Sequence, residues 1–253
     1  MLKESIKKQF LKLQTRQGRK KSPFYLCEGL RCGDEALQFQ YENVEAVVLA
    51  ENFSDRDVLS KIEAHAQVFR GTQKEMEALA QTENPQGLIL LMKKQEEKAF
   101  EGVDPFTLIL DGLGEPGNVG TILRTAKAIG LKEVLLTKGT VDPLNAKAIR
   151  AGMGAQFALN IVTVDSLAAL KSDSRFADKT FWLTTPHEGT ACYADEFTLK
   201  DNVLVMGAEA NGIEDFSVGE KVTIPMPGKS ESLNVAQAAT IFLFEGVRRG
   251  LMV

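Results

Sequence analysis

The second half of the chain alternates short apolar runs with stretches of helical periodicity, and this alternation restricts its fold more than any other feature. The apolar runs, each long enough for one strand, are FTLIL, EVLLT, TFWLT and NVLVMG. Helical periodicity follows at Val119–Ile129, near Leu144–Arg150, at Ser166–Leu170 and in a long final helix from about Val235 to Arg248. Strands that are apolar throughout and joined by helices predict a parallel sheet covered on both faces.

The first 92 residues alternate on a smaller scale. We expect extended and helical segments at Phe24–Cys27, Asp34–Gln40, Ala46–Ala50, Asp55–Ala64, Val68–Arg70 and Gly87–Met92. Thr72 and Glu75 have the spacing of a capping box ahead of a helix over Met76–Ala80. Residues 93–105, KKQEEKAFEGVDP, are charged and end in proline, as is typical of a linker. The sequence therefore predicts a basic arm (1–21), a small α/β domain (22–92), this linker and a larger α/β domain (106–253).

The apolar runs and the cysteines exclude two classes of protein. No run approaches the roughly 18 to 20 apolar residues that a membrane span needs, and the N-terminus lacks an apolar signal core, so we expect a cytoplasmic protein. Three cysteines, Cys27, Cys32 and Cys192, have no metal-ligand spacing, and only His65 and His187 could join them. We therefore expect neither a structural metal nor a disulfide scaffold.

Charge is distributed unevenly along the chain. The net charge is −4, but residues 1–21 contain eight basic residues against Glu4 alone. Such a local patch can bind the phosphate backbone of a nucleic acid. The affinity for nucleic acid depends on how many phosphates the protein contacts, and not on the total charge of the protein. The alternative is a solvated helix face with Ile6, Phe10 and Leu13 packed inward.

A glycine-rich turn follows the first strand of the larger domain. Gly112, Gly114 and Gly117 spell the dinucleotide fingerprint G-x-G-x-x-G, which makes a Rossmann-type oxidoreductase a rival hypothesis. Pro116 weakens it by removing an N–H donor from the turn, and the strand Val134–Thr137 lacks the acidic residue that binds ribose.

Polar residues follow this turn and recur in two later segments. Asn118, Gly120 and Arg124 have the spacing N-x-G-x-x-x-R, which leaves a groove beside a guanidinium suited to phosphate. The strand VLVM ends in GAEANGI, where Glu209 offers a carboxylate beside glycines. In IPMPGKSESLNVAQAATIFLFEG, Ser232 and Asn234 precede the final helix, and either one is also a good helix N-cap.

Together these three segments resemble the motifs of the SpoU-type RNA ribose 2′-O-methyltransferases of the SPOUT superfamily. The resemblance spans about Phe106 to Val253 and includes IRAGMGA around Arg150. Glu115 stands where the family often has aspartate. More weakly, FYLCEGLRCGDEAL and NPQGLIL resemble the ribosomal-protein-like RNA-binding domain that precedes the catalytic domain in many rRNA-modifying members.

The resemblance implies a deep trefoil knot, S-adenosylmethionine as the cofactor, no metal, and a homodimer formed through the knot and the final helix. It assigns activation of the ribose hydroxyl to Arg124, supported by Asn118, Glu209, Ser232 and Asn234. The implied cofactor-binding residues are Thr184, Gly207, Ile224, Met226 and Leu233.

RNA contacts are expected from Lys7, Lys12, Arg16, Arg19, Lys20, Arg124 and Arg150. The preceding domain and basic arm favour rRNA, with 23S rRNA foremost, over tRNA. A tRNA methyltransferase and a non-catalytic RNA-binding protein stay open beside the Rossmann oxidoreductase.

Overall fold

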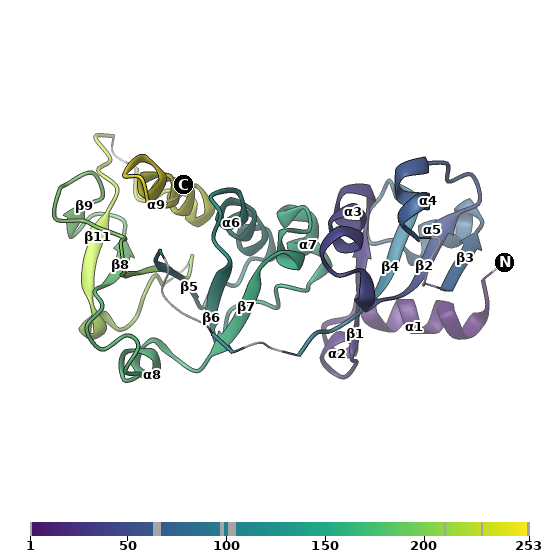
Figure 1. Ribbon diagram of the computed structural model, residues 1–253, viewed down its shortest axis with the longest axis horizontal. Helices are drawn as coiled ribbons and strands as arrows, with labels where there is room; N and C mark the ends of the chain where they lie inside the picture. Colours follow the sequence, from purple (N-terminus) through teal and green to yellow (C-terminus); the bar gives the residue numbers. More distant parts are fainter. Residues whose placement is uncertain are drawn as a thin grey trace. The chain divides into compact units, whose positions relative to one another are not determined.

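The computed structural model describes residues 2–62, 67–96, 99–100, 105–209, 211–228 and 230–251. Ala64, His65 and much of the expected linker 93–105 lie outside these residues. The chain forms two compact units, coloured along the sequence in Figure 1. The first contains Met1–Glu96 and Pro143–Ala158, and the second contains Glu97–Asp142 and Leu159–Val253. Residues 143–158, which the sequence-based boundary places in the larger domain, thus pack with the first unit.

The second unit is built on a seven-stranded sheet in the order β7-β6-β5-β10-β8-β11-β9, and every neighbouring pair is parallel. Its strands are β5 (Thr107–Asp111), β6 (Glu133–Thr137), β7 (Asn160–Val164), β8 (Phe181–Thr185), β9 (Thr190–Ala191), β10 (Val203–Gly207) and β11 (Glu220–Thr223). The parallel sheet predicted from the apolar runs is therefore confirmed. β10 lies between β5 and β8, so that Val205 pairs with both Ile109 and Leu183.

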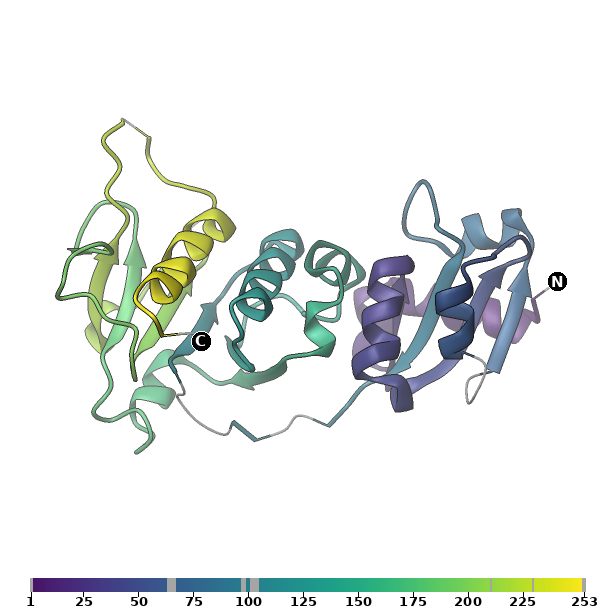
Figure 2. The same cartoon turned by 45° about the horizontal axis from the view of Figure 1, so that its top comes forward.

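Helices cover both faces of this sheet because successive strand residues point to opposite sides. Leu108 and Leu110 belong to the larger core, together with residues of α6 (Pro116–Ala128) and α9 (Val235–Arg248). Ile109 lies in a second core under α8 (Leu167–Lys171) and the 3-10 turn Phe216–Val218. α6 and α9 lie side by side in both cartoon views (Figures 1 and 2), with Thr125 and Thr240 hydroxyls 3.4 Å apart.

Helix bounds follow the capping residues. α6 begins at Pro116, three residues before the expected Val119, because the Glu115 side chain accepts from the Gly117 N–H at 3.2 Å and caps the helix. Pro116 fits there because the first helical residue needs no N–H partner. α9 has the bounds expected from sequence and begins at the cap Asn234.

The C-terminal end of α9 is held by two arginines around one buried carboxylate. Glu245, whose side chain is 3% exposed, accepts hydrogen bonds from Arg248 and from Arg249 Nε at 2.6 Å. Arg249 also donates to the carbonyls of Phe197 (2.6 Å), Ala194 (2.8 Å) and Cys192 (3.3 Å). Arg249 thereby fastens the helix end to the loop that follows β9.

The first unit has a four-stranded sheet in the order β1-β4-β2-β3, with only β2 and β3 parallel. Its strands are β1 (Phe24–Glu28), β2 (Val44–Ala50), β3 (Gln67–Gly71) and β4 (Leu88–Lys93). Its helices are α1 (Glu4–Gln14), α2 (Arg16–Lys20), α3 (Leu30–Phe39), α4 (Arg56–Ile62), α5 (Gln73–Leu79) and α7 (Ala146–Gly152), with 3-10 turns at Tyr41–Asn43 and Ala155–Phe157.

Two local predictions for the first unit are confirmed. Thr72 and Glu75 form the capping box of α5, and Phe10 and Leu13 of α1 are buried in the core. α3 begins at Leu30, four residues before the expected start, because Gly29 at φ 102° ends the strand abruptly.

The cysteines and the helices give two further findings. All three cysteines are buried and unpaired, and no group of metal-ligating side chains is found in the described parts of the chain. None of the described helices combines the length and the apolar character needed to cross a bilayer.

Candidate active site

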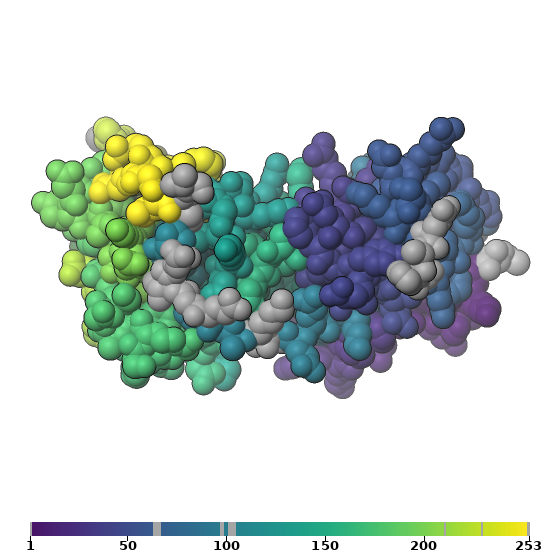
Figure 3. All heavy atoms as spheres, viewed as in Figure 1, coloured from purple at the N-terminus to yellow at the C-terminus, as the bar shows by residue number. Residues whose placement is uncertain are grey.

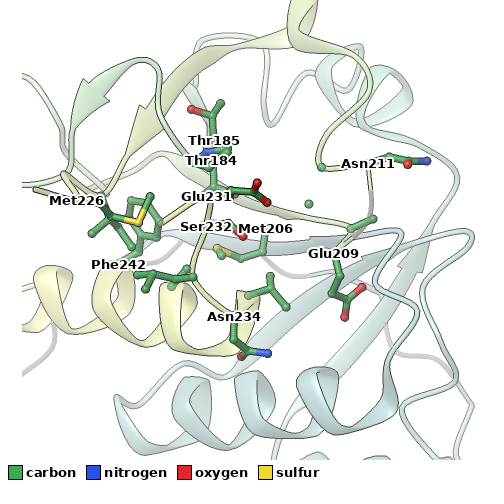
Figure 4. Close-up of a pocket in the computed structure, with 18 residues that line it drawn as sticks. Thr184, Thr185, Met206, Glu209, Asn211, Met226, Glu231, Ser232, Asn234 and Phe242 are labelled. Atoms are coloured by element: carbon green, nitrogen blue, oxygen red, sulfur yellow. The ribbon is translucent and has the colours of Figure 1, made fainter. Parts of the chain in front are cut away.

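A cavity of about 600 Å³ lies in the second unit, where β8, β10 and β11 end (Figure 4). Parallel strands present their carboxyl ends at one edge of the sheet, and the loops there are where ligands bind in such folds. Three chain segments and α9 enclose the cavity, which is lined by Thr184, Thr185, Pro186, Met206–Glu209, Asn211, Gly212, Ile224, Met226, Glu231–Val235, Ala238 and Phe242.

All five residues expected to bind a cofactor line this cavity: Thr184, Gly207, Ile224, Met226 and Leu233. Polar and apolar groups share the lining about equally, and the cavity volume lies in the range of small-molecule sites. Gly207 has no space for a side chain, since an added Cβ would lie 2.7 Å from the backbone N of Ile213. Glycine at this position therefore lets the end of β10 pack closely against the backbone of the following loop.

One hydrogen-bonded chain joins the three motif segments at the edge of the cavity. Asn234 Nδ2 donates to Asn118 Oδ1 at 3.0 Å, and Asn118 Nδ2 donates to Glu209 Oε1 at 2.8 Å. Asn234 Oδ1 accepts from the backbone N–H groups of Ala236 (3.0 Å) and Gln237 (3.3 Å). Glu209 Oε2 accepts from the Gly114 N–H at 3.2 Å.

This chain fixes the orientation of both amides. Because a helix N-terminus offers only N–H donors, Asn234 must point its oxygen at them and its NH₂ at Asn118. Asn118 then has its NH₂ directed at Glu209, which must accept. Partial burial acts to raise the pKa of Glu209, but the hydrogen bonds from Asn118 and from backbone N–H groups outweigh it and lower the pKa. Glu209 is thus held as a carboxylate.

Family models match both parts of the chain. The model of the SpoU rRNA methylase family matches residues 105–244, and that of the MRM3-like substrate binding domain matches residues 4–90. The chain belongs to the SpoU rRNA methylase family. Its two compact α/β units and large parallel sheet agree with the fold class predicted for a SpoU methylase.

Relatives and solved structures of SpoU methylases extend this match. The 23S rRNA (guanosine(2553)-2′-O)-methyltransferase RlmP of Bacillus subtilis is 30% identical over 94% of both chains. RlmB of Escherichia coli, a 23S rRNA (guanosine-2′-O-)-methyltransferase, is 36% identical over 57% of this chain and 60% of its own. The AdoMet-bound rRNA methyltransferase of Sinorhizobium meliloti superposes with a TM-score of 0.80 at 26% identity, covering 100% of this chain and 97% of that one.

The glycine-rich turn has a different role in this SpoU methylase from the one that the Rossmann hypothesis gives it. The Gly114 N–H, which that hypothesis would aim at a pyrophosphate, is donated to Glu209, and the Gly112 N–H to the hydroxyls of Thr137 and Thr140 at 3.1 and 3.0 Å. These donors are used within the protein, so the Rossmann oxidoreductase hypothesis is wrong.

The remaining candidate residues of this SpoU methylase occupy different positions. Ser232 lines the cavity, while Arg124 is exposed on α6, one helical turn after the buried Gly120. Among the described residues, Arg124 has no hydrogen-bond or ion-pair partner. Sequence reasoning missed Glu231, Ala238 and Phe242, which line the cavity. The spacing of Ala238 and Phe242, one helical turn apart, was an available signal.

Several basic residues of the first unit are engaged within the protein. Lys7 forms ion pairs with Glu4 (3.1 Å) and Glu75 (2.9 Å), and Arg150 lies 3.8 Å from the buried carboxylate of Glu28. Arg19 is 5% exposed and donates to the carbonyls of Leu13 and Gln14, so the structure gives it a packing role in place of the expected RNA contact. Lys12, Arg16 and Lys20 are exposed.

Proposed function

We propose that this protein transfers a methyl group from S-adenosylmethionine to a ribose 2′-hydroxyl of 23S rRNA. The observation that carries the proposal is the hydrogen-bonded chain Asn234–Asn118–Glu209, which gathers three distant segments at the edge of a ligand-sized cavity. The names of the relatives support the reaction and the RNA class, and the AdoMet-bound neighbour supports the cofactor.

The residues around the cavity fit this cofactor. Ile224, Leu233 and Met226 offer apolar surface suited to the flat adenine ring, while Gly207 and Thr184 offer backbone and hydroxyl groups for its polar atoms. Bound S-adenosylmethionine supplies an electrophilic methyl group on its sulfonium. The protein has to bring the ribose hydroxyl to that methyl in line, and such positioning lowers a barrier by several kcal/mol.

Arg124 is assigned to the ribose hydroxyl. A guanidinium is already protonated and is a reluctant base, so Arg124 orients the hydroxyl and stabilises the oxygen as its proton leaves to the neighbouring RNA phosphate or to solvent. Ser232 and Asn234 polarise the hydroxyl by hydrogen bonds. Asn118, itself bonded to Glu209, holds Asn234 in place. Arg124, exposed and without a partner among the described residues, is available for a substrate group.

The first unit is assigned to RNA capture. Lys12, Arg16 and Lys20 form its exposed basic arm, whereas Lys7 and Arg150 can contribute only from their existing ion pairs. Phosphate contacts by such residues make binding weaker as salt rises. A cytoplasmic location is proposed because rRNA is the substrate.

The protein is proposed to act as a homodimer through α9. Phe244 of this helix is 50% exposed, and Figure 3 shows the C-terminal helix, in yellow, on the outer surface of the second unit. Size-exclusion chromatography with light scattering tests this, and a mass of 27.7 kDa in solution contradicts it.

Methyl transfer to purified 23S rRNA and tRNA tests the function directly. A methylated ribose resists alkaline cleavage, so sequencing after hydrolysis locates the modified nucleotide and separates the rRNA assignment from the tRNA alternative. Arg124→Ala should abolish transfer while cofactor affinity changes less than about twofold. Equal loss of both would make Arg124 a structural residue, and cofactor binding without transfer to either RNA would favour the non-catalytic alternative.

A further inference from the structure

Glu231 is a second carboxylate in the cavity, and neither the motif resemblance nor the hydrogen-bonded chain gives it a role. It lies in the segment between Gly228 and the cap of α9, two residues after the undescribed Lys229, and it lines the cavity. Figure 4 shows its side chain extending into the middle of the pocket.

The two carboxylates of the lining differ in their partners. Glu209 is bonded to Asn118 and to the Gly114 N–H, so its charge is already compensated within the protein. Glu231 is exposed and, among the described residues, has no hydrogen-bond or ion-pair partner. Its charge is therefore available to whatever enters the cavity.

The described lining of the cavity contains no lysine, arginine or histidine. A cavity with two carboxylates and no described cation favours a positively charged ligand over a neutral one of the same shape. The methyl-donating cofactor and its demethylated product differ in charge. S-adenosylmethionine carries a sulfonium charge, whereas S-adenosylhomocysteine has a neutral thioether at the same atom.

We propose that Glu231 is a specificity-determining residue that favours the charged cofactor over its demethylated product through electrostatic attraction to the sulfonium side of the ligand. The proposal rests on the assignment of this cavity to S-adenosylmethionine. Its consequence is easier product release, because the attraction disappears when the methyl group leaves.

Isothermal calorimetry of Glu231→Gln with both ligands tests the proposal. Neutralising a solvent-accessible carboxylate near a unit charge is expected to weaken S-adenosylmethionine binding about three- to tenfold and to change S-adenosylhomocysteine binding less than about twofold. In the wild type the preference for the charged ligand falls as salt rises from about 0.05 to about 0.5 M, and in the variant it does not. Sinefungin, which has an amine near the sulfonium position, should behave like the charged cofactor.

Glu214→Gln is the matched control, because Glu214 is an exposed glutamate outside the cavity lining. It should leave both affinities unchanged. Equal weakening of both ligands by Glu231→Gln, or an unchanged preference, overturns the proposal while leaving the cofactor assignment intact.

Ala238→Leu fills the cavity from α9 and tests the cofactor assignment itself. If this variant binds S-adenosylmethionine as tightly as the wild type, or if the wild type binds neither ligand, the assignment fails and the role of Glu231 fails with it.

Discussion

Replacing Arg249 by methionine should destabilise the second unit far more than the same change at Arg248. Arg249 makes four hydrogen bonds, one to Glu245 and three to the carbonyls of Phe197, Ala194 and Cys192, and its side chain is 20% exposed. Bonds to a charged donor contribute about 1.5–3 kcal/mol each, but they are not additive here because all four share one guanidinium. We expect a loss of about 3 kcal/mol.

Among the described residues Arg248 bonds only to Glu245, and its side chain is 65% exposed, so Arg248→Met should cost about 1 kcal/mol or less. The single tryptophan reports on the same region, because the ring of Trp182 packs edge to face with Phe197, with 5.2 Å between centroids, and its N–H donates to the Thr198 carbonyl. Urea unfolding followed by tryptophan fluorescence should show a midpoint lower by about 1 M for Arg249→Met. A shift no larger than that of Arg248→Met refutes the idea that the helix end is held by Arg249.

Three further substitutions test contacts at the end of α9 and around the cavity. The Arg248 and Arg249 guanidinium groups lower the pKa of Glu245 from 4.5 to about 2. The contribution of the Glu245 carboxylate to folding stability is therefore complete above pH about 4.5 and is lost as pH falls toward 2. Glu245→Gln should flatten this part of the curve of unfolding free energy against pH, measured in acid titrations. Asn118→Asp sets a second carboxylate against Glu209 and should reduce methyl transfer at least about 100-fold while cofactor affinity, measured by calorimetry, changes less than about threefold. Gly207→Ala forces a Cβ within 2.7 Å of Ile213 and should lower both thermal stability and cofactor affinity.

Local patterns in the sequence predict local structure well. The bounds of α9 follow from its apolar periodicity and its cap Asn234, and the capping box of α5 follows from two residues three positions apart. The parallel sheet follows from strands that are apolar on both faces. These features depend on interactions between near neighbours, which the order of residues displays directly.

Pairings between distant residues are hidden in the sequence. Asn118 and Glu209 are 91 residues apart, and Asn118 and Asn234 are 116 apart, so spacing cannot show that they share one hydrogen-bonded chain. For the basic arm, the sequence suggests more free charges than the fold leaves. Lys7 and Arg19 look like free charges in the sequence. In the fold, Lys7 forms an ion pair with Glu75, and Arg19 donates hydrogen bonds to two backbone carbonyls.

The place of β10 in the sheet determines when this unit can fold during synthesis. β5, β6 and β7 form one half of the sheet and β8, β11 and β9 the other, and β10 is the strand that joins them. β11 follows β10 in the chain, so until Val203–Gly207 has left the ribosome β8 has no neighbouring strand and the inner edge of β5 is unpaired. Such edges promote association between chains. A unit completed by late, long-range pairing folds slowly, so a chaperone that shields the edges of β5 and β8 should raise the yield of native protein.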